Sequence, residues 1–211
     1  MQKILNGAIV FLITIALLLL GYYLFFSQKS TPQTTSAKHP YTQLQTPSVK
    51  GLFPPLDTHF DLTTIDNKTF HIEAKNKMFK IQGLENKLVF LKVFGWECQY
   101  CTKEIPELIK LKQDLGETFE VIAIEAQHSS LKEAKQKVKE YGINYNIVLG
   151  NQYQEFYAYL KAHYGWSGII PLTIVLGKEG RVLAFELGAK SYTLAELMKA
   201  SLEREKALRQ P

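Results

Sequence analysis

Both cysteines of the chain lie in one short segment, Gly95 to Pro106, with the sequence GWECQYCTKEIP. Cys98 and Cys101 are three positions apart, a spacing that suits a structural disulfide, half of a zinc site or a reactive thiol pair. A zinc site needs about four ligands, and the chain has no third cysteine and no histidines at ligand spacing. A structural disulfide across so short a loop would restrict the unfolded chain little. The pattern therefore favours redox chemistry at the two sulfurs.

The elements on either side of the cysteines position them for that chemistry. Residues 88–94 (LVFLKVF) form a nearly continuous apolar run, typical of a central strand buried on both faces. Apolar residues at helical spacing follow over 102–115. Cys98 is therefore expected at the start of a helix, where unpaired N–H groups and the helix dipole favour a thiolate. Cys101 lies about one turn later, close enough to attack a mixed disulfide formed at Cys98.

The remaining pattern predicts an α/β fold. Capping-box spacings at Ser130–Glu133 and Thr193–Glu196 mark the starts of two helices. Alternating apolar residues over 60–72 indicate a hairpin that precedes the core. Strands and helices that alternate before a final strand pair imply a central mixed sheet with helices on both faces. The other expected elements are strands over 119–126, 172–176 and 181–187, and helices over 130–142, 152–164 and 193–208.

An uncharged apolar segment, residues 4–26, lies near the start of the chain and is about long enough to span a bilayer as a helix. A cleaved signal peptide is the alternative, but the run exceeds the roughly 7 to 15 apolar residues of such a peptide, and no small-residue cleavage site follows closely. We expect an uncleaved signal anchor, with residues 1–3 in the cytoplasm. Residues 27–51, rich in Ser, Thr, Gln and Pro, predict a flexible linker to a folded domain over 52–211.

Composition limits the class of protein. With 46% hydrophobic and 21% charged residues, the chain has the balance of a globular protein. Its net charge of +5 comes from lysines spread along the sequence, so no basic stripe for nucleic acid is present.

A domain carried across the membrane by the anchor would lie where thiols can be oxidised. We therefore expect a single-pass protein of a bacterial inner membrane, with its catalytic domain in the periplasm.

The segment VFLKVFGWECQYCTKEIP resembles the active-site segment of thioredoxin-fold proteins. Its C-x-x-C-x-x-E-x-P pattern is most similar to the membrane-anchored TlpA, ResA and CcmG group, and the resemblance extends over about residues 60–187. It implies a thioredoxin-like fold and a Cys98–Cys101 redox disulfide, with neither cofactor nor metal. It also implies that Pro171 is a cis-proline beside the cysteines. A trans-proline that begins a strand is the alternative for Pro171.

Several side chains near the cysteines are candidates for binding or tuning. Trp96, Ile170 and Pro171 are expected to contact substrate. Glu97 stands directly before the first cysteine, where thioredoxin relatives usually place a tryptophan, and its charge would raise the thiol pKa. Glu104 occupies the acidic position of the ResA-like pattern. One hypothesis is that it tunes thiol acidity or passes protons; the other is that it is an ordinary carboxylate in the first turn of the helix, stabilised by the helix dipole.

Lys92 is the most unusual of these residues, because it interrupts a strand expected to be buried on both faces. By alignment to Cys98 it falls where thioredoxins keep a buried acidic group. A buried lysine is costly unless it is paired or neutral. One hypothesis is that Lys92 reaches Glu104 or the Cys101 thiolate and favours the reduced pair. The other is that its long side chain extends to the surface.

The function expected from these residues is that of a thiol-disulfide oxidoreductase. The resemblance implies a reductase of protein disulfides, supplied by a membrane thiol donor and acting on apocytochrome c before haem attachment. An oxidising or isomerising enzyme of the same fold is the first alternative. A copper-binding or copper-delivery protein is the second, since thiolates select Cu(I), with His128 or His163 as an added ligand.

Overall fold

The computed structural model describes residues 54–208. The expected anchor, linker and cytoplasmic N-terminus (4–26, 27–51 and 1–3) lie outside the described residues. Within 54–208, no helix is both long and apolar enough to cross a membrane.

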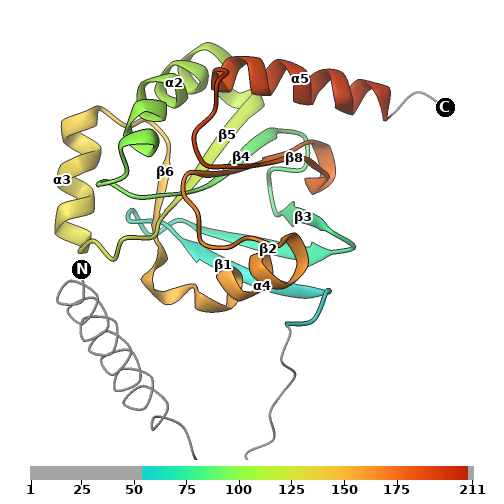
Figure 1. Ribbon diagram of the computed structural model, residues 1–211, viewed down its shortest axis with the longest axis horizontal. Helices are drawn as coiled ribbons and strands as arrows, with labels where there is room; N and C mark the ends of the chain where they lie inside the picture. The colour runs from blue at the N-terminus through green and yellow to red at the C-terminus, as the bar shows by residue number, and fades with distance from the viewer. Residues whose placement is uncertain (1–53, 209–211) are drawn as a thin grey trace, which may run out of the picture. The chain divides into compact units, whose positions relative to one another are not determined.

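A five-stranded mixed sheet forms the centre of the domain, in the order β6-β5-β4-β7-β8 (Figure 1). Its first three strands along the sheet are parallel, whereas β7 and β8 run antiparallel to their neighbours. Every residue of the two long parallel strands β4 and β5 is buried, as their apolar runs predict. The strands are β4 (Leu88–Phe94), β5 (Phe119–Glu125), β6 (Asn146–Leu149), β7 (Leu172–Leu176) and β8 (Val182–Leu187).

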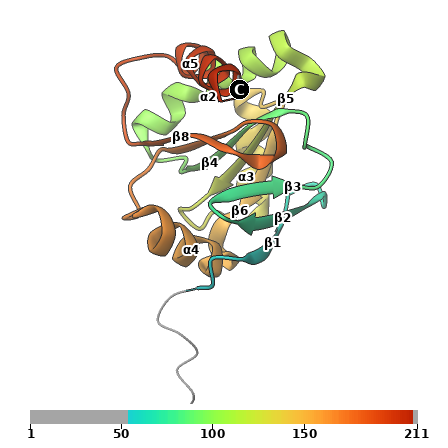
Figure 2. The same ribbon diagram turned by 90° about the vertical axis from the view of Figure 1, so that its right-hand side faces the viewer.

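Helices cover both faces of this sheet, as expected (Figures 1 and 2). On one face, α2 (Gln99–Leu115), α3 (Leu131–Tyr141) and α5 (Leu194–Ala207) pack over a shared apolar cluster. On the other, α4 (Gln154–Tyr164) packs with the N-terminal strands. Both predicted capping boxes are present, at the starts of α3 and α5. Short 3-10 turns occur at η1 (Gly116–Thr118), η2 (Gly150–Gln152) and η3 (Lys178–Gly180).

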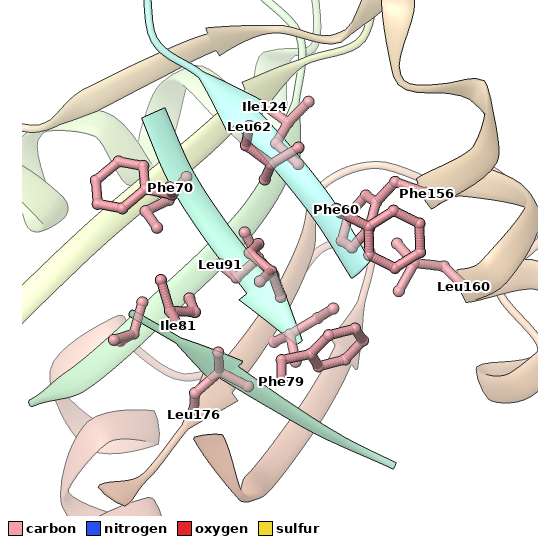
Figure 3. Packing of buried hydrophobic residues seen from close by; sticks show 14 of the residues in the cluster. Phe60, Leu62, Phe70, Phe79, Ile81, Leu91, Ile124, Phe156, Leu160 and Leu176 are labelled. Carbon is pink, nitrogen blue, oxygen red and sulfur yellow. The ribbon is translucent and has the colours of Figure 1, made fainter. Parts of the chain in front are cut away.

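The expected N-terminal hairpin is present as β1 (Thr58–Thr63) and β2 (Thr69–Lys75), and β3 (Met78–Ile81) extends it to a three-stranded antiparallel sheet. The inner face of this small sheet packs against the central sheet and α4, where apolar side chains from all three converge (Figure 3). Three of the aromatic rings, Phe60, Phe79 and Phe156, meet there edge to face. The small sheet and α4 thus cover one face of the central sheet, and α2, which carries the cysteines, packs on the other face with α3 and α5.

Three elements differ from the sequence prediction. The strands β3 and β6 were not predicted, because each has only four residues and shows too short a period to recognise. Helix α2 begins at Gln99, directly after Cys98, rather than at residue 102. The earlier start moves every following residue of α2 about one turn deeper into the helix.

Candidate active site

The two cysteines form a disulfide at the junction of β4 and α2, with their Cα atoms 5.2 Å apart. Cys98 is the N-cap residue of α2, in extended conformation, and its Sγ accepts the backbone N–H of Cys101 at 3.2 Å. Cys98 is half-buried, whereas Cys101 is only 2% exposed. A thiolate at Cys98 would thus lie at the positive end of the helix and remain accessible, while Cys101 is shielded.

The segment before β7 approaches the disulfide from the neighbouring strand. The Ile170–Pro171 peptide bond is cis, as the resemblance implied, and the carbonyl oxygen of Ile170 lies 3.9 Å from Cys98 Sγ. Ile169, the residue before, is 52% exposed. Ile170 therefore lies beside the accessible sulfur, and Pro171, the next residue, is buried.

Lys92 is buried beneath the helix that carries the cysteines, with 1% of its surface exposed. Its Nζ donates to Glu104 Oε2 at 2.7 Å and to Thr173 Oγ1 at 2.6 Å. Of the two hypotheses for this lysine, extension to the surface is wrong and contact with Glu104 is confirmed. Burial lowers the pKa of Lys92 from 10.5 to about 8, although the Glu104 carboxylate acts in the opposite direction.

Glu104 bridges two lysines. Its second oxygen, Oε1, accepts from Lys190 Nζ at 2.8 Å, and the side chain of Lys190 is only 4% exposed. Because α2 begins at Gln99, Glu104 lies beyond the first turn and is 8% exposed. The view of Glu104 as an ordinary first-turn carboxylate is therefore wrong. We call Lys92, Glu104 and Lys190 the buried charge cluster.

Trp96 and Glu97 connect β4 to Cys98 and contact a different part of the domain. The indole Nε1 of Trp96 donates to Ser129 Oγ at 3.3 Å, and its ring stacks parallel to Tyr141 of α3. The carboxylate of Glu97 is exposed, while its backbone N–H donates to Gln127 Oε1 at 2.8 Å. Trp96 is thus fixed against α3.

Comparison with known proteins agrees with this geometry. Residues 59–185, which include the strand β4 and the helix α2 on either side of Cys98, match the AhpC/TSA family. The chain belongs to the AhpC/TSA family. Its thioredoxin-like fold, with a mixed sheet and a cysteine pair at the first helix after a central strand, is the fold expected from the sequence.

Two curated relatives of this AhpC/TSA chain carry the same name, thiol-disulfide oxidoreductase ResA. The protein from Bacillus subtilis (strain 168) is 27% identical over 131 residues, which cover 61% of this chain and 69% of the relative. The protein from Halalkalibacterium halodurans is 28% identical over 127 residues, covering 59% and 67%.

Solved structures show the same fold at lower identity. A secreted thiol-disulfide isomerase from Corynebacterium glutamicum superposes with a TM-score of 0.56 and 19% identity, covering 71% of this chain and 85% of that one. A thiol:disulfide interchange protein from Chlorobium tepidum TLS gives a TM-score of 0.53 and 21% identity, with 72% and 96% covered. At this identity the likeness supports the fold of the AhpC/TSA chain, not its substrate.

The structure adds functional candidates that sequence patterns missed. Thr173 accepts a hydrogen bond from Lys92, and Lys190 donates one to Glu104 from the loop between β8 and α5. The sequence signal for Thr173 is its place in an apolar strand, two residues after Pro171. In the structure it stands opposite Lys92 in the antiparallel β4–β7 pair. Within 54–208, no group of three or more His, Cys, Asp or Glu side chains is arranged to bind a metal ion.

Proposed function

We propose that this protein is a thiol-disulfide oxidoreductase that uses Cys98 and Cys101 as its redox pair. One observation carries the proposal: the two sulfurs are bonded at the N-terminus of α2, with the accessible Cys98 as N-cap and the shielded Cys101 one turn inside. The relatives named thiol-disulfide oxidoreductase support the same assignment. In this arrangement only one of the two sulfurs is open to a protein substrate.

The reaction proceeds by two exchanges at sulfur. In the reduced enzyme, the Cys98 thiolate attacks one sulfur of a substrate disulfide, and the other substrate sulfur leaves as a thiolate. Cys101 then loses its proton and attacks Cys98, which releases the second substrate sulfur and closes the enzyme disulfide. Two electrons pass from enzyme to substrate; the proton of Cys101 and one proton from solvent end on the two substrate thiols.

The buried charge cluster is the proposed means of handling the proton of Cys101. Glu104 follows Cys101 by three positions, so both lie on the same buried face of α2. We assign to Glu104 and Lys92 the tuning of Cys101 acidity and the movement of its proton. Positive charge at this position favours a thiolate, stabilises the reduced pair and raises its reduction potential.

Substrate would bind across the surface that surrounds Cys98. The cis-proline segment contributes the carbonyl of Ile170, and the large apolar residues Ile169 and Tyr100 are 52% and 54% exposed. An extended protein segment could lie over these side chains and present its disulfide to Cys98. Trp96 would contribute through its exposed edge only, because its ring is packed against α3.

We propose reduction of substrate disulfides as the direction of electron flow, with residues 4–26 as an inner-membrane anchor and the domain in the periplasm. The support is the C-x-x-C-x-x-E-x-P pattern together with the uncharged apolar segment. The proposed partners are a membrane thiol donor and apocytochrome c. A reduction potential near about −270 mV agrees with a reductase, and one near about −120 mV with an oxidising enzyme.

Trapping of the mixed disulfide tests the enzyme class. In cells that express the full chain, Cys101→Ser should accumulate covalent complexes with substrate proteins that a reducing agent releases, because the resolving thiol is gone. Cys98→Ser is the matched control and should trap none. Equal trapping by both variants, or by neither, would contradict the proposed roles. The redox state of the wild-type pair in the cell tests direction, since a reductase should be found mostly reduced.

A copper-binding function receives less support. Of the two histidines proposed as added ligands, His163 places its Nε2 2.8 Å from the carbonyl oxygen of Pro54 and packs against Tyr159. His128 lies in the loop after β5, in a left-handed conformation. Stoichiometric Cu(I) binding that is lost when either histidine is replaced would restore this alternative.

A further inference from the structure

Glu125 is a buried carboxylate at the end of β5, with no exposed surface. Its Oε1 accepts the backbone N–H of Gln127 at 2.8 Å, and its Oε2 accepts both the N–H and the hydroxyl of Ser129 at 3.0 and 2.7 Å. Over residues 54–208 no salt bridge involves this carboxylate. A buried carboxylate is costly unless it is hydrogen-bonded. The three hydrogen bonds to Glu125 therefore restrain the backbone of the loop from 126 to 129.

This loop binds the two residues that precede Cys98. Gln127 Oε1 accepts the backbone N–H of Glu97 at 2.8 Å. Ser129 Oγ accepts the indole N–H of Trp96 at 3.3 Å. The Glu125 carboxylate is therefore linked to the segment before Cys98 by two chains of hydrogen bonds. One runs through Gln127 to the Glu97 N–H, and the other through the Ser129 hydroxyl to the Trp96 indole.

Gly95 shows how closely Gln127 approaches that segment. Gly95 is buried, and a methyl group added to it would lie 2.2 Å from Cδ and Oε1 of Gln127. Its backbone is not in the left-handed region that favours glycine, so the reason for glycine here is space. Although the outer side of Gln127 is exposed, its amide lies directly on the main chain of Gly95.

We propose that Gln127, held by Glu125, is a positioning residue for Cys98: it keeps the Gly95–Glu97 segment in the shape that places the Cys98 sulfur over the N-terminus of α2. The role rests on the proposed function of Cys98. Other contacts of the segment include those of the Trp96 ring with Ser129 and Tyr141 and the Cys98 N–H bonded to the Gly95 carbonyl at 3.3 Å. Among the described residues, Gln127 alone accepts the N–H of Glu97, the residue directly before Cys98. Without the Gln127 carbonyl, the Glu97 peptide turns more freely, and the thiolate loses part of its interaction with the helix N–H groups.

A double-mutant cycle in the full-length reduced chain tests this role, with Cys101→Ser as background so that Cys98 is the single thiol. The measured quantity is the rate of Cys98 alkylation by iodoacetamide from pH 4 to 9, which gives the thiol pKa and the limiting rate. Gln127→Ala should lower the rate at neutral pH by about threefold to tenfold, the size of one hydrogen bond. Gly95→Ala should have the same effect, because its methyl displaces Gln127.

Non-additivity decides the outcome. The Gly95→Ala/Gln127→Ala double variant should react no more slowly than either single variant, since both act through one contact. Gln127→Met, which keeps the volume without the acceptor, should behave like Gln127→Ala, and Gln127→Glu should preserve the limiting rate. Effects that add, or single variants that leave both the rate and the pKa unchanged, overturn the proposal. Gln136→Ala, an exposed glutamine on α3, is the matched control.

Two features keep this test separate from other causes. Alkylation does not depend on the proposed activity. The coupling between Gly95 and Gln127 can therefore be measured even in a protein that fails to reduce insulin disulfides. Apart from the conservative Gln127→Glu, the substitutions leave every charged group beside the segment in place. Those groups line a hollow of about 400 Å³ next to Trp96 and are Glu97, Glu125, His128, Glu133 and Lys137.

Discussion

Replacement of Lys92 by methionine should change how stability depends on pH. Lys92 is buried, and its pKa falls from 10.5 to about 8 in the folded protein, chiefly through burial. Each pKa unit corresponds to about 1.4 kcal/mol, so the folded state resists protonation of this lysine by about 3 kcal/mol. Methionine has a similar length and no charge, and it leaves Glu104 paired with Lys190.

The sign follows from the two pKa values. Below pH 8 the lysine is protonated in both the folded and unfolded states, and above 10.5 it is neutral in both. Between these limits the unfolded state holds a proton that the folded state has released, so the free energy of unfolding rises with pH. Wild type should therefore gain about 3 kcal/mol relative to Lys92→Met between pH 7.5 and 10.5.

The assay is urea unfolding of the oxidised proteins at several pH values across that range. In the oxidised state the cysteines carry no titrating proton, and the other lysines and tyrosines cancel in the difference between variants. Lys110→Met is the control, because the side chain of Lys110 is 73% exposed; its profile should run parallel to wild type. Parallel profiles for Lys92→Met as well would show that the lysine titrates normally and would refute the reasoning.

The same variant tests the link between the buried charge cluster and the redox pair. If Lys92 favours the reduced cysteines, Lys92→Met should have a lower reduction potential, by about 30 mV for each 1.4 kcal/mol of lost thiolate stabilisation. Glutathione equilibration followed by thiol labelling measures it. An unchanged potential would mean that the lysine serves the fold alone.

Three further changes probe the charge cluster and the frame around it. Glu104→Gln leaves two buried lysines without their shared anion and should cost about 3 to 5 kcal/mol in urea unfolding; a loss below about 1 kcal/mol would contradict the burial of these charges. Thr193→Ala removes a helix cap and should cost about 1 kcal/mol, whereas Thr193→Ser should not. Gly180→Ala should lower the free energy of unfolding by more than about 2 kcal/mol, because the added methyl meets the Phe79 carbonyl and the backbone is left-handed; Gly83→Ala, left-handed with open space around it, should lose only the smaller strain energy.

The long elements of the fold were predictable because each carries its own signal. The apolar runs of β4 and β5 predicted two buried strands, and the capping boxes at Ser130 and Thr193 predicted the starts of α3 and α5. The strand β3 was not predictable, because it follows a two-residue turn at Asn76 and Lys77 in which both residues are left-handed. Such turns usually contain glycine, and without one the sequence gives no sign that the chain reverses.

The residues of the site also differ in whether the sequence carries a local signal for them. Cys98, Cys101 and Glu104 form a local pattern on one helix, and Lys92 stood out as a charge in an apolar strand. Lys190 had no such signal, since it binds Glu104 across 86 residues of sequence. Contacts of this kind depend on the complete tertiary structure, which no local period describes.

The loop from 188 to 193, together with the first residue of α5, explains why the redox pair depends on the C-terminal part of the domain. The Gly188 N–H donates to the Pro171 carbonyl, Lys190 to Glu104, and the Leu194 N–H to Glu107 of α2. One short connection thus contacts both the cis-proline segment and the helix that carries the cysteines. Among the described residues, the hydrogen bonds to the Glu104 and Glu107 carboxylates of α2 come only from this connection and from Lys92, so displacement of the connection would expose the buried charges next to Cys101. The electrostatic surroundings of the cysteines are therefore completed only when α5 has docked on α2.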